Sequence, residues 1–178
     1  MSLPKELLPR YTYEDYRNWK GDWELVEGIP FALASPSVKH RRVLAKLVRY
    51  IDEALENCRN CEVLPDTDYI VDEYTVLRPD VAVVCDNKGE KITVTPKVVF
   101  EIVSPSTAKM DEITKKGIYE REGVPLYVLV YPHLRKVKIF KLSPEGVYKK
   151  LVDLSGGNFS FDLEGCEFTL NFDKILEV

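Results

Sequence analysis

Hydrophobic and polar positions along the chain follow helical spacing in some stretches and strand-like spacing in others, which predicts helices packed on a sheet. A first helix is expected after Ser37, a residue that can cap a helix, because apolar side chains recur there at helical spacing. Its apolar stripe consists of Val43, Leu44, Leu47, Val48, Ile51 and Leu55. A second helix is expected over 107–122 and ends before Gly123, a common C-terminal signal.

Short runs rich in β-branched and apolar residues predict strands between and after these helices. The expected strands are 62–64, 69–71, 81–84, 98–103, 126–131 and 137–142. Continuous apolar runs such as 81–84 and 98–103 suit central strands that are buried on both faces. The order of helices and strands is typical of the α/β (α+β) class, with a mixed β-sheet core flanked by helices.

Turn residues predict additional β-hairpins near both ends of the chain. Gly28 separates two apolar segments near the N-terminus, and turns at 144–146 and 155–158 separate short apolar strands near the C-terminus. No repeat, low-complexity tract or long linker interrupts the sequence. Residues 1–178 are therefore expected to form a single domain.

Composition and charge restrict how the chain could meet a nucleic acid. The 178 residues are 45% hydrophobic and 30% charged, the balance of a soluble globular protein. With 25 Lys and Arg against 29 Asp and Glu the net charge is −4, so binding a polyanion requires a local basic patch. One side of the first helix offers such a patch, and a solvated surface is the alternative. Its basic residues are Lys39, Arg42, Lys46 and Arg49.

No stretch of the sequence has the length and polarity of a membrane anchor. Apolar runs stay well short of the roughly 20 residues that a membrane span needs. The first residues also lack the uninterrupted apolar segment of a signal peptide. We therefore expect a cytoplasmic protein without a membrane partner.

The four cysteines are Cys58, Cys61, Cys85 and Cys166. The first two have the C-x-x-C spacing of zinc sites and redox pairs, but the other two are isolated and the chain has only two histidines. We expect structural thiols. A disulfide and a zinc site are the alternatives.

Two carboxylates stand in positions where charge is costly. Glu101 interrupts an apolar strand, and Asp80 follows Pro79 at the head of another. If the two strands are neighbours, the two acids converge, and a divalent cation such as Mg²⁺ relieves their repulsion. The alternative is that Asp80 caps a turn and that Glu101 pairs with Arg78 or with a lysine.

The second predicted helix carries three polar residues on one face. Asp111, Lys115 and Tyr119 are spaced at i, i+4 and i+8. One interpretation is a solvated salt bridge between Asp111 and Lys115. The other is that the helix delivers Lys115 to the carboxylates, where it could stabilise the transition state of a phosphoryl transfer.

The two histidines have different expected roles. His40, near the start of the first helix, can form a structural hydrogen bond at the helix terminus, or it can contact substrate or transfer protons. His133 is expected to lie in a loop.

Taken in order, these residues belong to a set of motifs that resembles a known family. The motifs are Glu24-Leu25-Val26-Glu27-Gly28, Ser35-Pro36-Ser37 with His40, Arg78-Pro79-Asp80-Val81, Phe100-Glu101-Ile102-Val103-Ser104-Pro105-Ser106-Thr107, Asp111 with Lys115 and Tyr119, and Gly123-Val124-Pro125. The set covers roughly residues 10–142 and resembles the Uma-type family of bacterial endonucleases, within the PD-(D/E)XK restriction-endonuclease-like superfamily. The resemblance implies a restriction-endonuclease-like fold.

The resemblance also implies a set of acidic site residues. Asp80 and Glu101 would bind the catalytic metal, Mg²⁺ or Mn²⁺, with the main-chain carbonyl of Ile102 as a further ligand. Glu24 matches an upstream acid that would complete the pocket, and Glu27 is the weaker match of the two.

The catalytic lysine implied by the resemblance lies on the second helix. The superfamily usually carries it two residues after the glutamate, where this chain has Val103. Lys115 fits the position that the family uses instead, and Lys116, about 100° further around the helix, is the poorer candidate. Asp111 would orient Lys115, and Tyr119 would support it.

The resulting functional prediction is a Mg²⁺-dependent endonuclease that hydrolyses phosphodiester bonds in DNA. A non-catalytic nucleic-acid-binding or assembly module that keeps the nuclease fold is the alternative, because a fold alone does not determine function. RNA shares the same chemistry and stays open as a substrate. A homodimer is expected because enzymes that cut both strands of a duplex commonly present two sites.

Overall fold

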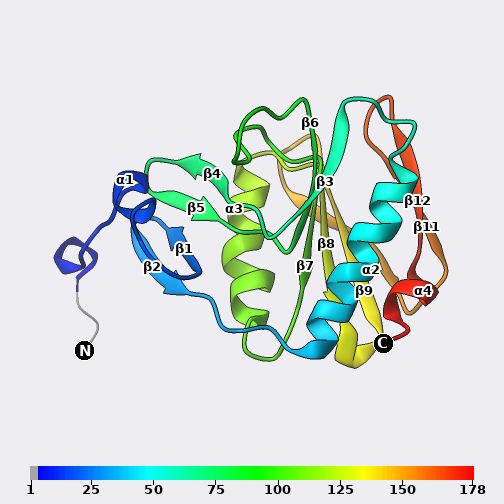
Figure 1. Ribbon diagram of the computed structural model, residues 1–178, viewed down its shortest axis with the longest axis horizontal. Coiled ribbons are helices and arrows are strands. Elements are labelled where there is room, and N and C mark those ends of the chain that lie inside the picture. Colours follow the sequence, from blue (N-terminus) through cyan, green and yellow to red (C-terminus); the bar gives the residue numbers. More distant parts are fainter. Residues whose placement is uncertain (1–3) are drawn as a thin grey trace.

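The computed structural model describes residues 4–178 and is built around a six-stranded mixed sheet (Figure 1). The strand order is β10-β9-β8-β7-β6-β3, in which β7 and β8 are parallel and the other neighbours are antiparallel. These strands are β3 (Cys61–Pro65), β6 (Val81–Cys85), β7 (Val98–Ile102), β8 (Leu126–Tyr131), β9 (Lys136–Leu142) and β10 (Tyr148–Leu154). A helical crossover joins β7 to β8, as a parallel pair requires.

One face of this sheet is covered by helix α2 (Val38–Ala54). The helix begins at the predicted cap, because the side-chain oxygen of Ser37 accepts a hydrogen bond from the main-chain N–H of His40 at 3.2 Å. The predicted apolar stripe faces the sheet. Its most deeply buried members are Val43, Leu47 and Ile51.

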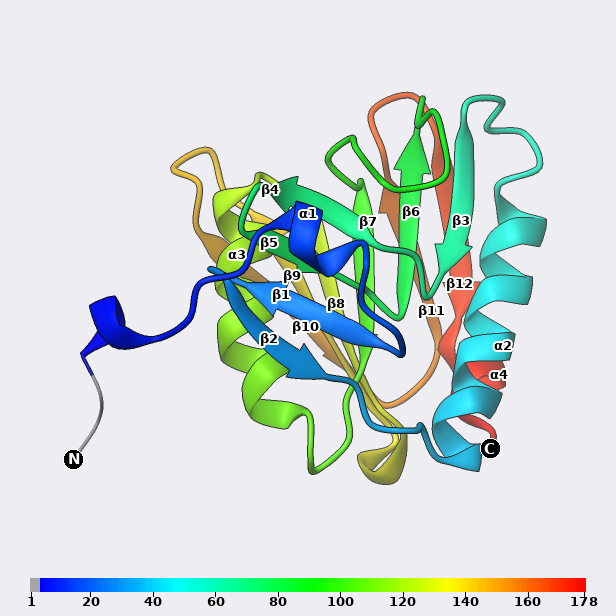
Figure 2. The ribbon, with the colours of Figure 1, turned by 60° about the vertical axis from the view of Figure 1, so that its left-hand side comes forward.

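The C-terminal elements extend the same layer. They are β11 (Asn158–Asp162), β12 (Glu167–Asn171) and the short helix α4 (Phe172–Leu176). Figure 2 shows α2, α4 and the β11–β12 hairpin together on one side of the molecule. Phe100 and Ile102 of β7 point into this apolar layer.

The opposite face is covered by a helical segment and a smaller sheet. The helical segment contains a π-helical stretch, η2 (Met110–Lys115), followed by α3 (Lys116–Arg121). The smaller sheet has the order β2-β1-β5-β4, with strands β1 (Trp23–Val26), β2 (Ile29–Ala32), β4 (Tyr69–Asp72) and β5 (Thr75–Leu77). Because side chains alternate along a strand, Val99 and Glu101 of β7 point to this face.

The hairpin predicted around Gly28 is formed by β1 and β2. Its turn residues Glu27 and Gly28 have φ values of 50° and 85°, the left-handed conformation of a two-residue hairpin turn. A Cβ atom at residue 28 would lie 2.2 Å from Cγ of Arg10, so a side chain does not fit there. Helix α1 (Tyr13–Tyr16) precedes this hairpin and is capped by Thr12. The other short helical turns are η1 (Lys5–Leu7) and η3 (Pro132–Leu134).

The predicted fold class is confirmed, and the differences lie in short elements. Each of the six predicted strands is present. The sequence gives no signal for β5 or α4, since three and five residues are too few for a clear periodicity. The prediction of a hairpin turn at 155–158 is wrong. That segment leads from β10 into a different sheet, and the hairpin turns instead between β11 and β12.

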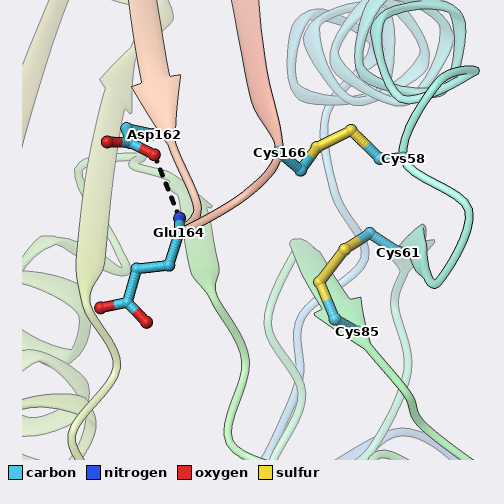
Figure 3. The surroundings of a disulfide bond; sticks show 6 residues. All are labelled: Cys58, Cys61, Cys85, Asp162, Glu164 and Cys166. Carbon is cyan, nitrogen blue, oxygen red and sulfur yellow. Dashed lines mark hydrogen bonds between the residues drawn. A yellow bond between two sulfur atoms is a disulfide. The ribbon is translucent and has the colours of Figure 1, made fainter.

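The cysteines form two disulfides, so the expectation of free thiols is wrong (Figure 3). Cys61 faces Cys85 across the antiparallel β3–β6 pair, with their Cα atoms 4.0 Å apart. Cys58, which follows α2, is bonded to Cys166 between β11 and β12, with a Cα–Cα distance of 5.6 Å. The C-x-x-C spacing cannot reveal this pairing, because the partners are 108 and 24 residues away.

Two findings concern the cellular compartment. Within residues 4–178, no helix is long and apolar enough to cross a membrane. Disulfides persist mainly in oxidising environments and in intracellular proteins of hyperthermophiles. A cytoplasmic location therefore stays a prediction.

Candidate active site

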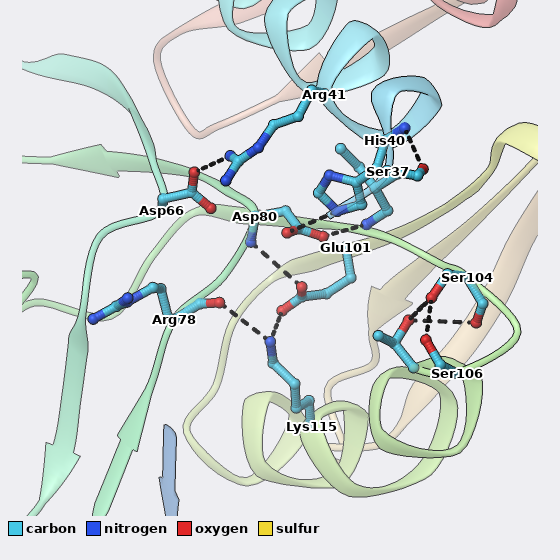
Figure 4. A network of polar contacts seen from close by, with 12 residues as sticks. Ser37, His40, Arg41, Asp66, Arg78, Asp80, Glu101, Ser104, Ser106 and Lys115 are labelled. Atoms are coloured by element: carbon cyan, nitrogen blue, oxygen red, sulfur yellow. Dashed lines mark hydrogen bonds and ion pairs between the residues drawn. The ribbon is translucent and has the colours of Figure 1, made fainter. Parts of the chain in front are cut away.

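Two charged side chains are buried where η2 packs on the central sheet. Lys115 Nζ lies 2.6 Å from Glu101 Oε1 of β7, and both side chains are at most 4% exposed. Lys115 Nζ also lies 2.9 Å from Glu24 Oε1 of β1. One buried ammonium group therefore joins residues from three elements that are far apart in the sequence. Figure 4 shows its contact with Glu101.

The π-helical stretch η2 carries both Asp111 and Lys115, and both are buried. The sequence predicts a regular α-helix here, whereas a π-helix is wider and places successive turns differently. Such stretches are rare and frequently occur at functional sites. The alternative of a solvated Asp111–Lys115 salt bridge is wrong, because among the described residues the ion pairs of Lys115 are with Glu24 and Glu101.

Asp80 lies beside Glu101 because β6 and β7 are antiparallel neighbours. Val81 pairs with Phe100, so Asp80 stands next to Glu101 across the two strands. The N–H of Asp80 donates to Glu101 Oε2 at 3.4 Å, and the N–H of Ile102 donates to Asp80 Oδ2 at 2.7 Å. The structure thus brings together the two acids that the sequence predicts to converge, with the main chain of Ile102 beside them.

The main chain of Arg78 closes another side of this group. Its N–H donates to Glu24 Oε1 at 2.8 Å, and its carbonyl accepts from Lys115 Nζ at 3.3 Å. The sequence does not predict this role, because a main-chain contact does not depend on the residue type. The one available signal is that Arg78 opens the motif that contains Asp80.

Two tyrosines support the buried charges from the same layer. The hydroxyl of Tyr119 donates to Glu101 Oε1 at 3.0 Å. The hydroxyl of Tyr127 donates to the main-chain carbonyl of Asp111 at 2.7 Å. Tyr119 therefore holds the Glu101 carboxylate directly, whereas Tyr127 holds the main chain of η2 at Asp111.

The weaker sequence candidates lie away from the buried charges. Lys116 Nζ sits 3.9 Å from the ring centroid of Phe140. Glu27 is exposed in the β1–β2 turn, where it lines a cavity of about 500 Å³ that contains neither Asp80 nor Glu101. Val103 packs in the apolar layer on the α3 face.

The charges around Lys115 do not balance. We call Glu24, Asp80, Glu101, Asp111 and Lys115 the Lys115 cluster. With every member ionised, one positive and four negative charges give 1 − 4 = −3.

This imbalance appears in the pKa values of the buried acids. Burial raises the pKa of Glu101 well above its ordinary value; Lys115 opposes that shift, whereas Asp80 and the other acids add to it. Burial also raises the pKa of Asp111 to about 6. For Lys115, burial alone would lower the pKa, but the surrounding acids outweigh it and raise the pKa well above its ordinary value. Lys115 therefore stays charged, and its one ammonium group does not neutralise all of the surrounding acids.

His40 reaches the cluster from α2. Its Nε2 lies 3.2 Å from Asp80 Oδ1, and the two side chains are 15% and 18% exposed. Its Nδ1 is buried without a hydrogen-bond partner among the described residues. His40 and Asp80 are thus both partly open to solvent.

The basic face of α2 is partly engaged in structural contacts. Lys46 Nζ donates to the main-chain carbonyls of Lys174 and Glu177 near the C-terminus. Arg49 pairs with Glu53 on the same helix at 2.9 Å. Whether this face contacts a nucleic acid stays a prediction, with Lys46 and Arg49 already engaged by these partners.

Comparison with known proteins gives the family of this chain. The profile of the Uma2 family, described as "Putative restriction endonuclease", matches residues 11–172. The chain belongs to the Uma2 family, so the family expectation is confirmed.

A solved structure shows the same fold. The crystal structure of "a putative nuclease belonging to DUF820" from Anabaena variabilis ATCC 29413 matches with a TM-score of 0.73, covering 93% of this chain and 97% of that chain. The sequence identity is 14%, so the likeness is one of fold. No curated protein matches the chain.

Proposed function

We propose that this chain is a Mg²⁺- or Mn²⁺-dependent endonuclease that hydrolyses phosphodiester bonds in DNA, with the Lys115 cluster as its active site. Membership of the Uma2 family supports the reaction class. One observation carries the assignment to these residues: Lys115 is 3% exposed and lies between Glu101 and Glu24 in a group with excess negative charge.

The oxygen atoms of Asp80 and Glu101 fit a divalent cation. Mg²⁺ commonly takes one or two carboxylates and completes its shell with water and substrate phosphates. Among the described residues, no group of three or more His, Cys, Asp or Glu side chains is placed to hold a metal. Asp80, Glu101 and the carbonyl of Ile102 would hold the cation, which when bound would polarise a phosphoryl oxygen and activate a water.

The remaining roles belong to the other side chains of the cluster. The Lys115 ammonium, held by Glu24, would stabilise the negative charge that develops on the phosphate. Tyr119 would fix Glu101 through the hydrogen bond to Oε1. The charge of Asp111 helps to keep Lys115 protonated.

DNA would approach where Asp80 and His40 meet solvent. Lys39 and Arg42, in the same part of α2, are the candidate phosphate contacts that this position offers. We include a C2 homodimer in the proposal, since cleavage of both strands needs two sites. Its size in solution is measurable by light scattering.

A plasmid-nicking assay with Mg²⁺ or Mn²⁺ tests the proposal. Glu101→Gln, Asp80→Asn and Lys115→Met should each lower the rate by at least about 100-fold, because each removes a charge that acts on the reacting phosphate. Lys116→Met is the matched control, since it removes the neighbouring lysine that contacts Phe140, and it should cut normally. Circular dichroism of each variant checks that the fold is intact.

The same assay separates the alternatives. Normal cleavage by a folded Glu101→Gln protein would overturn the site. A wild-type chain that binds DNA but never nicks it with either cation would favour the non-catalytic module. A structured RNA substrate in parallel reactions decides between the two nucleic acids.

A further inference from the structure

A second pocket lies beside Arg78, next to the Lys115 cluster. Its volume of about 190 Å³ is below the roughly 300–1,000 Å³ of pockets for drug-sized ligands, which suits a single planar ring system. Four aromatic side chains line it, together with cationic side chains that are partly exposed. The residues concerned are Tyr13, Tyr16, Trp19 and Trp23, with Arg17 and Lys91.

The aromatic rings form a connected wall from α1 to β1. The ring centroids of Trp19 and Trp23 are 5.7 Å apart, and those of Tyr16 and Trp19 are 5.5 Å apart. Tyr16 is buried, whereas both tryptophans keep part of their surface exposed. Every nucleobase has a face that can stack on such rings.

Asp68 fixes the cations around this pocket. Its side chain is 3% exposed, Oδ1 accepts from Tyr16 Oη at 3.0 Å and from Arg78 Nε at 2.8 Å, and Oδ2 accepts from Lys91 Nζ at 2.8 Å. We call Asp68, Tyr16, Arg78 and Lys91 the Asp68 cluster. Lys91 and Arg17, with side chains 44% and 57% exposed, remain accessible to a phosphate at the opening.

Arg78 connects this pocket to the Lys115 cluster. Its carbonyl faces Lys115, whereas its side chain points away from that lysine (Figure 4) and donates to Asp68 and Asp22. One arginine side chain therefore separates the two sites. Consecutive nucleotides of a stacked strand are about 3.4 Å apart, so the pocket lies within reach of a base near the scissile phosphate.

We propose that this pocket binds an unpaired nucleobase of the strand that the Lys115 cluster cleaves, one or two nucleotides from the scissile phosphate. The base stacks on the face of one of the two indole rings and meets the other at its edge, because the rings of Trp19 and Trp23 are inclined at 66° to each other. Arg17 and Lys91 contact the adjoining phosphates. This assignment rests on the proposed function. Drawing a base out of a duplex costs energy, so the pocket favours single-stranded or distorted DNA.

Intrinsic fluorescence reports on this pocket directly, because the two tryptophans of the chain are the two that line it. The full chain is titrated in EDTA with a five-nucleotide deoxycytidine oligomer, with deoxycytidine monophosphate, and with a DNA duplex long enough to stay paired at the assay temperature. We expect saturable quenching by the oligomer, at least about tenfold weaker binding of the mononucleotide, and the weakest binding of the duplex.

Two arginine variants form a matched pair for the phosphate contact. Arg17 and Arg49 are both exposed and both pair with a glutamate close in sequence, Glu14 for Arg17 and Glu53 for Arg49. Arg17→Gln should weaken binding of the oligomer and make its salt dependence shallower by about 0.7 in the log–log slope. Arg49→Gln should change neither. Trp19→Ala should weaken binding about tenfold, and Arg17→Gln keeps the test valid if that variant does not fold.

Each failure has a separate meaning. Absence of quenching by the oligomer, equal behaviour of the two arginine variants, or equal affinity for the duplex would overturn the pocket. If the mononucleotide bound as tightly as the oligomer, the proposal that the pocket binds a base within a strand would be overturned. Because EDTA prevents metal-dependent cleavage, these outcomes are independent of nicking: an active nuclease without quenching overturns the pocket alone, and quenching in a chain that never nicks overturns the proposed function alone.

Discussion

Two buried ion clusters meet at Arg78 and differ in how their charges balance. In the Asp68 cluster a carboxylate that is 3% exposed has two cationic partners, Arg78 and Lys91. In the Lys115 cluster the proportions are reversed, because one buried ammonium faces several acids. Arg78 serves the first cluster with its side chain and the second with its main chain.

The difference in charge balance shifts the pKa values of the buried acids in opposite directions. Burial alone would raise the pKa of Asp68, but hydrogen bonds from Lys91 and Arg78 outweigh it and hold the pKa below its ordinary value. The pKa of Glu101 is raised instead. The charge of a buried carboxylate with sufficient cationic partners is already compensated, whereas a further cation would stabilise the excess negative charge of the Lys115 cluster. Perturbed acids of this second kind concentrate at functional sites.

The largest expected effect on stability comes from replacing Lys115, the one cationic side chain of the Lys115 cluster. Lys115→Met leaves Glu101 and Glu24 buried without their partner at 2.6 and 2.9 Å. Breaking a buried ion pair in this way should lower the free energy of unfolding by roughly 3–5 kcal/mol. Urea denaturation of the metal-free protein measures it.

The neighbouring lysine is the control for that loss. Lys116→Met removes the contact with the Phe140 ring and should cost at most about 1 kcal/mol. Equal losses in the two variants would mean that the buried pairs add nothing beyond ordinary packing, and the comparison between the clusters would then lose its basis.

The next effect is stabilisation by a divalent cation. At a free Mg²⁺ or Mn²⁺ concentration of about 100 times Kd, the free energy of unfolding should rise by about 2.7 kcal/mol. The gain should disappear in Asp80→Asn and Glu101→Gln but persist in Asp68→Asn, because the Asp68 cluster already has its cations. A gain that survives in Glu101→Gln would place the cation elsewhere.

Much of the fold follows from local pattern. Continuous apolar runs predict the central strands, and Ser37 with the stripe around Leu47 predicts α2. The sequence does not predict β5, which has three residues, or the pairing of Cys58 with Cys166, which depends on where α2 ends relative to the β11–β12 turn. Pairing between distant segments is set by packing, and packing has no short-range signal.

The residues of the candidate site likewise fall into those that the sequence predicts and those that it does not. Glu101 and Asp80 could be selected from residues alone, because a charge in an apolar strand is costly. Lys115 was separable from Lys116 only through helical spacing and the family resemblance, and the π-helical stretch that carries it leaves no periodic signal. Asp68 is as deeply buried as Lys115, but it lies beside a short strand and does not interrupt an apolar run. Its burial therefore leaves no signal in the sequence.

The smallest expected effect is a dependence of stability on pH that has opposite signs in the two clusters. The folded metal-free protein holds the proton of Asp111 up to about pH 6, whereas the unfolded chain releases it near the ordinary value of 3.8. Raising the pH through this interval therefore favours unfolding. Relative to Asp111→Asn, the wild type should lose about 2 kcal/mol between pH 4 and pH 7.

Asp68 should behave in the reverse manner, because its folded-state pKa is lowered. Its contribution to stability is present above the pKa of the unfolded chain and is lost as the pH falls below it. The free energy of unfolding of the wild type, relative to that of Asp68→Asn, should therefore increase as the pH rises. Denaturation of the three proteins from about pH 2 to pH 7 measures both differences, because the Asp68 difference falls mainly below the ordinary pKa of 3.8 and the Asp111 difference above it. If both differences changed in the same direction, the acids of the Lys115 cluster would be as well compensated as Asp68, and the cluster would have no need of a bound cation.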